Sequence, residues 1–180
     1  MNEQKLRAVV QMNDYAPQRE IVEVNYGRDL ILPSGMRPLT TVRHSLIRYQ
    51  RDSLSFRAVR LPGGVRFCDA RQLFEKTDRV SIGAPNEHRE ITAPLVFAQH
   101  LMVNQNKIPK RVQGRIIVFT ESFLVDFTGK QYIRTLEYNQ HKKCWEPGII
   151  EAFGAAFYPE YFVIPYCKLF FGRVIKDTQN

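Results

Sequence analysis

The chain has few of the residues that form disulfides or bind metals. Its 180 residues include three scattered cysteines, Cys68, Cys144 and Cys167. An odd, scattered set is typical of reduced thiols rather than of a disulfide framework. The four histidines are isolated, and the nearest approach to a metal-ligand pair is His141 with Cys144. Because a structural zinc site needs four ligands, we predict no metal and no other cofactor.

Long apolar runs are also missing. No stretch of about 18 apolar residues occurs, so the sequence predicts no membrane-spanning helix and no membrane partner. Residues 1–15 have no apolar segment of the kind found in signal peptides. Together with the scattered cysteines, these absences predict a cytoplasmic protein.

The common catalytic and nucleotide-binding motifs are missing as well. There is no Gly-x-x-x-x-Gly-Lys or Gly-x-Gly-x-x-Gly loop and no Gly-x-Ser-x-Gly elbow. One set of residues has enzymatic potential: Glu121, Asp126 and Glu137, expected on neighbouring strands, could hold a divalent cation for phosphodiester cleavage. The sequence therefore leaves open whether the protein is an enzyme, and a small metal-dependent nuclease is one alternative.

Positive charge is what the chain does have, and one stretch concentrates it. The net charge is +8, and residues 37–79 contain ten basic residues, nine of them arginine, against four acidic ones. Arginine makes planar, bidentate contacts with phosphate or carboxylate groups. We therefore expect an anionic partner, either nucleic acid or an acidic protein surface.

Alternation and turn residues predict an α+β fold, dominated by strands in one mixed or antiparallel sheet with two or three short helices. The clearest element is a β-meander with strands at residues 115–120, 123–127 and 131–138. Further strands are expected at 5–12, 19–26, 54–61, 161–164 and 167–175, and helices at 70–76, 92–104 and 151–157.

Three segments are less regular. Residues 39–50 have apolar spacing that is more helical than alternating, and residues 81–90 have the composition of a loop. Residues 104–114 are polar and basic, and we expect an exposed loop there. The chain is expected to form a single domain, 1–180, with the basic loop near residues 104–114 as an alternative point of subdivision before the meander.

The leading hypothesis is a non-enzymatic binding protein that engages nucleic acid or a nucleoprotein assembly. In the strand at 54–61, Leu54 and Phe56 share one face while Arg57 lies on the other, so such a strand can bury aromatics and present guanidinium groups. Six arginines are expected to contact phosphate: Arg43, Arg48, Arg51, Arg57, Arg60 and Arg66.

The alternative from a different class is a structural subunit of a larger protein assembly, such as a phage particle or a secretion machine. The arginines would then pair with acidic groups, on this chain or on a neighbouring subunit. The aromatic residues of the segment 152–175 would form the core and part of an interface with a protein partner or a second copy.

Overall fold

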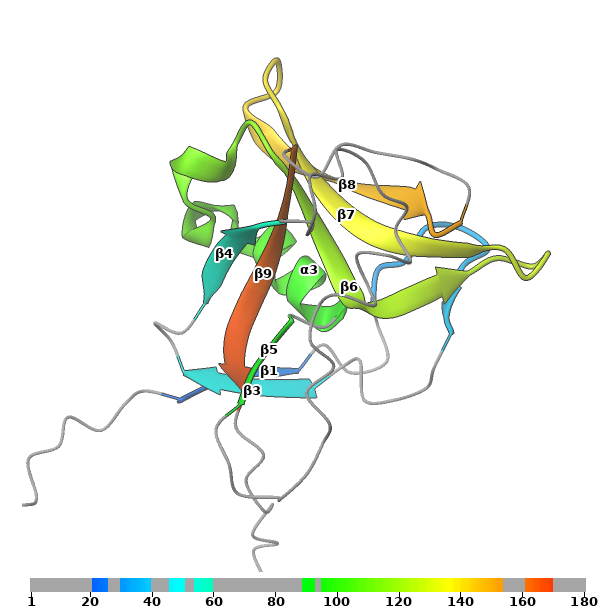
Figure 1. The fold of residues 1–180 in the computed structure, drawn as a ribbon, viewed down its shortest axis with the longest axis horizontal. Coiled ribbons are helices and arrows are strands. Elements are labelled where there is room, and N and C mark those ends of the chain that lie inside the picture. Colours follow the sequence, from blue (N-terminus) through cyan, green and yellow to red (C-terminus); the bar gives the residue numbers. More distant parts are fainter. Residues whose placement is uncertain are drawn as a thin grey trace, which may run out of the picture.

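The computed structural model describes residues 21–25, 30–39, 46–50, 54–59, 89–92, 95–153 and 161–169. In this part of the chain lie nine strands, one α-helix and two short 3-10 helices (Figure 1). The strands are β1 (Ile21–Asn25), β2 (Arg37–Pro38), β3 (Leu46–Gln50), β4 (Ser55–Ala58), β5 (Arg89–Thr92), β6 (Ile116–Val125), β7 (Gln131–Asn139), β8 (Cys144–Glu151) and β9 (Phe162–Leu169). The helices are α3 (Leu95–Val103), η3 (Gln105–Lys107) and η4 (Lys110–Val112). The expected strand-dominated fold with a mixed sheet is confirmed in outline, with one α-helix among the described residues.

All nine strands belong to one curled sheet, and β9 is its hub. The main path runs β1-β3-β9-β6-β7-β8. Strand β9 is antiparallel to β3, β4 and β5 and parallel to β6. Tyr166 of β9 is in register with both Ser55 of β4 and Thr92 of β5, so these two strands lie on opposite edges of β9. Each edge of β9 therefore pairs with more than one strand, one after the other along its length.

Helix α3 lies inside the curl and is buried on nearly all sides (Figure 1). Its apolar residues join one core cluster with residues of β1, β3, β6, β7, β8 and β9. A helix surrounded in this way needs apolar residues all round rather than on one stripe. The expected start of this helix at residue 92 is wrong, because residues 89–92 form strand β5.

The other face of the sheet carries a second apolar cluster. Val118, Ile133, Ala152, Phe162 and Ile164 are its buried members. Alternation along the strands places Ile117 of β6 on the α3 side and Val118 on the second side. Both faces of the central strands are therefore buried.

Strand β6 corrects the expected meander. Two strands, 115–120 and 123–127, were predicted, but residues 116–125 form one strand with an irregularity. Phe119 is in register with Arg134 and Phe123 with the adjacent Ile133, so residues 120–122 have no counterpart on β7. This bulge turns Phe123 to the second face, whereas Phe119 packs on the α3 side.

Proline misled the prediction in the last third of the described chain. The expected strands 161–164 and 167–175 were separated at Pro165, but β9 runs unbroken through it. Pro165 lies between the part of β9 that pairs with β6 and the part that pairs with β5, where a missing N–H is tolerated. Strand β8 was not predicted and contains Pro147, which an edge strand accommodates. Glu151 ends β8, so the helix expected from residue 151 does not begin there.

Three other expectations are corrected. Residues 46–50 form strand β3 rather than a helix, since Tyr49 packs inside the curl against Phe97 with ring centroids 4.9 Å apart. Residues 89–90, expected in a loop, belong to β5. Residues 104–114 form η3 and η4 instead of a loop, because Ile108 and Val112 are buried in the core. The expected elements at 5–12 and 70–76 lie outside the described residues.

Candidate functional site

The arginines expected to contact phosphate are only partly described. Arg57 is exposed on β4, with its guanidinium carbon 4.6 Å from the centroid of the Tyr166 ring, which is a cation–π arrangement. Arg48 lies in β3, in register with Glu23 of β1. Arg43, Arg51, Arg60 and Arg66 lie outside the described residues.

The structure does not bring the expected nuclease carboxylates together. Asp126 follows the end of β6, while Glu137 lies near the other end of β7, six residues beyond Gln131, which is in register with Val125. At about 3.3 Å per strand residue, their backbones are roughly 20 Å apart. Glu121 lies in β6 between them. Within the described part of the chain, no three His, Cys, Asp or Glu side chains are grouped so that they could hold a metal ion.

Asp126 instead organises the β6–β7 turn. Its Oδ1 accepts hydrogen bonds from the Thr128 N–H (2.8 Å), the Thr128 hydroxyl (2.7 Å) and the Lys130 N–H (3.0 Å). Its Oδ2 accepts one from the Tyr132 hydroxyl at 3.2 Å. The Thr128 hydroxyl, followed by the other donors, lowers the pKa of Asp126. The carboxylate is therefore occupied with the turn that presents Phe127, whose side chain is 92% exposed.

Exposed basic side chains gather at the opposite end of β6 and β7. The segment 104–115 carries Lys107, Lys110, Arg111 and Arg115 and contains no acid. All four of these side chains are exposed. The β7–β8 turn adds Lys142 and Lys143 from the other side, next to the exposed His141. These six Lys and Arg residues are called the basic end below.

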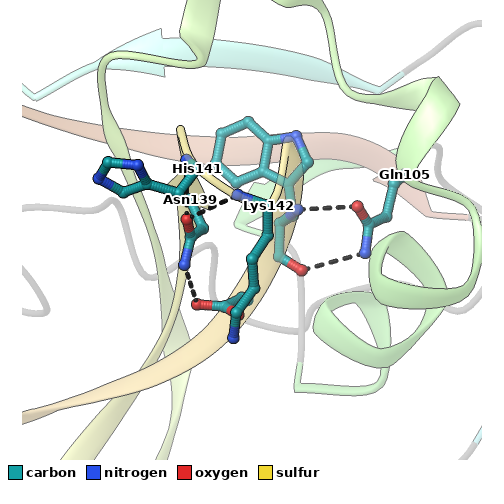
Figure 2. Close-up of polar contacts among 6 residues, drawn as sticks. Gln105, Asn139, His141 and Lys142 are labelled. Atoms are coloured by element: carbon teal, nitrogen blue, oxygen red, sulfur yellow. Dashed lines mark hydrogen bonds and ion pairs between the residues drawn. The ribbon is translucent and has the colours of Figure 1, made fainter.

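A pair of hydrogen bonds from Gln105 holds the two parts of the basic end together. The Gln105 side-chain amide donates to the Trp145 carbonyl at 3.0 Å and accepts from the Trp145 N–H at 2.8 Å. Figure 2 shows Gln105 reaching from its helical turn to the strand beyond the Asn139–Lys142 turn. The Gln105 side chain therefore pairs with the edge strand β8 through one donor and one acceptor, as the backbone of a neighbouring strand would. It fixes η3 beside the start of that strand.

The β7–β8 turn is ordered by its own polar side chains. Asn139 Oδ1 accepts hydrogen bonds from the backbone N–H groups of His141 and Lys142, both at 3.0 Å (Figure 2). Glu146 accepts from Asn139 at 2.9 Å and forms an ion pair with Lys142 at 2.7 Å. The Lys142 hydrogen bond, followed by the one from Asn139, lowers the pKa of Glu146. Lys142 is thus partly neutralised.

The remaining cations of the basic end are not neutralised by acids. Lys110, Arg111, Arg115 and Lys143 make no ion pair in the described part of the chain. Lys107 directs its ammonium group to the buried His100, with Nζ 3.4 Å from Nε2. Concentrated, unpaired cations form a positive surface that attracts anions.

His100 links the basic end to the core. Its ring is 6% exposed, and Nε2 lies 3.0 Å from the Tyr49 hydroxyl. Burial, and secondarily the charge of Lys107, lowers the pKa of His100 to about 4. The histidine is therefore a neutral group beneath the cationic surface.

An exposed aromatic ring lies beside this surface. Ile116 of β6 is in register with Phe162 of the parallel β9, which places the preceding residues, Arg115 and Tyr161, next to each other. The Tyr161 side chain is 56% exposed, while Phe162 is buried. Of the aromatic segment that was expected to serve as an interface, Tyr161 is thus the described residue with the most exposed ring.

The basic end was not among the site residues predicted from sequence. The predicted site lies among the arginines of residues 37–79, and the segment 104–114 is predicted only as an exposed basic loop. One signal was present: four basic residues without any acid in the twelve positions 104–115. The contribution of the β7–β8 turn had no sequence signal, because it depends on the Gln105–Trp145 contact.

Comparison with protein-family models, curated proteins and solved structures found no match to this chain. No helix in the described ranges is long and apolar enough to cross a lipid bilayer.

Proposed function

We propose that the protein is a non-enzymatic binding protein that engages nucleic acid through the basic end. The observation that supports this most is that six exposed Lys and Arg side chains come from two separate segments, residues 104–115 and the β7–β8 turn, which contain no acid and which Gln105 joins. Arg57 and the other arginines predicted to contact phosphate, between Arg43 and Arg66, would add contacts to an extended substrate.

The chemistry suits a polyanion better than a single small anion. The basic side chains are exposed and spread over a turn, two 3-10 helices and the residue before β6, so each can meet a different phosphate. Phosphate contacts of this kind dominate the affinity of nucleic-acid-binding proteins and are largely independent of base sequence. Tyr161 beside Arg115 can stack on an unpaired base, which favours a single strand over a duplex.

Charge reversal tests the proposal. The double variant Lys110→Glu, Arg111→Glu changes the basic end, and Arg37→Glu with Lys130→Glu changes the net charge equally near the β6–β7 turn. Binding of single-stranded and duplex oligonucleotides is measured by fluorescence anisotropy from low to physiological salt. The basic-end variant should lose roughly tenfold or more in affinity at low salt, and its dependence on salt should become shallower.

The control variant should bind nearly as well as the unmodified protein. The proposal is contradicted if the unmodified protein binds neither oligonucleotide at low salt, or if both double variants lose the same affinity. Thermal unfolding of each variant shows whether the fold is retained.

A second candidate is a subunit of a larger assembly, and the observation that favours it is Phe127. This aromatic side chain is 92% exposed on a turn that Asp126 orders through four hydrogen bonds. An exposed, preorganised aromatic ring is typical of protein interfaces. Sedimentation analysis of the unmodified protein and of Phe127→Ser distinguishes this candidate, because an assembly through Phe127 should dissociate in the variant.

A further inference from the structure

Arg134 is a nearly buried cation for which the described structure provides no counter-charge. It lies at the centre of β7, in register with Phe119 of β6 on one side and Ile149 of β8 on the other. Its residue exposure is 8%. In the described part of the chain it makes neither an ion pair nor a hydrogen bond. Burying a charge without a partner is costly, so natural proteins rarely retain one without a use.

The register neighbours of Arg134 are apolar, and the nearest acid on β8 is already engaged. Phe119 belongs to the core cluster on the α3 side, and burial lowers the pKa of the Arg134 guanidinium. Glu151 faces Tyr132, two residues before Arg134, and is paired with Lys130 at 2.8 Å. Among the described residues the cation is therefore not neutralised, and its burial keeps it from being freely hydrated.

The guanidinium group is nevertheless within reach of solvent. Among the described residues, the one fully enclosed side-chain polar atom without a hydrogen bond is Thr135 Oγ1, so the Arg134 nitrogens are not completely enclosed. Ile149, its neighbour on β8, is partly exposed. The side chain is thus largely buried while its nitrogens keep some contact with solvent.

We propose that Arg134 is an anion-binding site that takes a single phosphate group in a bidentate contact. Arginine presents paired N–H donors whose spacing matches two phosphate oxygens. The partly dehydrated surroundings strengthen such a contact in comparison with one at the exposed basic end. The phosphate group belongs either to a small ligand or to the backbone of a bound nucleic acid. The site does not depend on the function proposed above.

Thermal unfolding tests this assignment with inorganic phosphate as the probe, against potassium chloride at equal ionic strength. Phosphate at about 20 mM should raise the melting temperature of the unmodified protein by roughly 3 °C. Arg134→Met should remove most of this increase, and it should melt at the same or a higher temperature than the unmodified protein in chloride alone, because it buries no charge. Arg134→Lys should respond weakly, since it keeps the charge without the bidentate geometry.

Arg37→Met is the matched control, because Arg37 is an exposed arginine of β2. It should respond to phosphate like the unmodified protein. An oligonucleotide without terminal phosphates distinguishes the two sources: Arg134-dependent stabilisation by this probe indicates backbone phosphate, and stabilisation by inorganic phosphate alone indicates a small ligand. The assignment is overturned if neither probe stabilises the protein, or if Arg134→Met and Arg134→Lys retain the full phosphate response.

Discussion

The two ends of the β6–β7 pair are built by different means. The β6–β7 turn is held by its own residues, with the Asp126 carboxylate accepting four hydrogen bonds from positions two to six residues away. The basic end is held by Gln105, which bonds to Trp145 forty residues later. A local turn can change without disturbing the rest of the fold, whereas the basic end depends on the packing of the whole α3 region.

Among the predicted changes, acidification should lower the free energy of unfolding most, through His100 beneath the basic end. The pKa of His100 is about 4 in the folded protein, below its ordinary value of 6.5, because of burial and the nearby Lys107. The unfolded chain therefore takes up the proton first as the pH falls. The free energy of unfolding is therefore highest above about pH 6.5. It falls progressively towards pH 4, by roughly 3 kcal/mol. Urea unfolding at several pH values measures it.

The variant His100→Gln should have a flatter dependence of unfolding free energy on pH between 6.5 and 4. His141→Gln is the control, because that imidazole is exposed in the β7–β8 turn. An equally steep dependence in His100→Gln would show that other groups are responsible.

Removal of the Gln105 amide should have the next largest effect on the free energy of unfolding. Gln105→Ala loses two hydrogen bonds to the backbone of Trp145 and should lower the free energy of unfolding by about 2 kcal/mol. The fluorescence of Trp145, the only tryptophan, should change as its surroundings loosen. Gln113→Ala is a matched control, since Gln113 has no side-chain hydrogen bond in the described structure. Equal losses in the two variants would contradict the role given to Gln105.

Glycine-to-alanine substitutions test the β6–β7 turn, and they should change the free energy of unfolding less than the variants above. Gly129 in the β6–β7 turn has φ +85°, so Gly129→Ala should cost roughly 1–2 kcal/mol through backbone strain although no atom obstructs the new methyl group. Gly114 beside the basic end also leaves room for an added methyl group, and its φ is not in the left-handed region. Gly114→Ala should therefore leave the free energy of unfolding nearly unchanged. Chemical denaturation compares them. A cost at residue 114 as large as that at residue 129 would contradict the explanation by backbone angle.

Sequence reasoning predicted the locally determined parts of the fold. The strand at residues 19–26 and the last strand of the meander, 131–138, agree closely with β1 and β7. It placed the irregularity of β6 correctly but took it for a chain reversal, since three residues without a pairing partner resemble a turn. It missed β8 and divided β9, because whether a strand tolerates proline depends on which strands lie beside it.

For function, the sequence by itself determined the net charge of +8 and the supply of Arg and Lys from which any anion-binding surface must be built. Turn-forming residues also determined the β6–β7 turn at residues 126–130, since such preferences act within a few positions. Tertiary structure alone decided which cations share a surface, that His100 is buried beneath Lys107, and that Arg134 has no counter-charge among the described residues. Contacts between distant segments depend on the packing of the complete chain, and no local pattern encodes them.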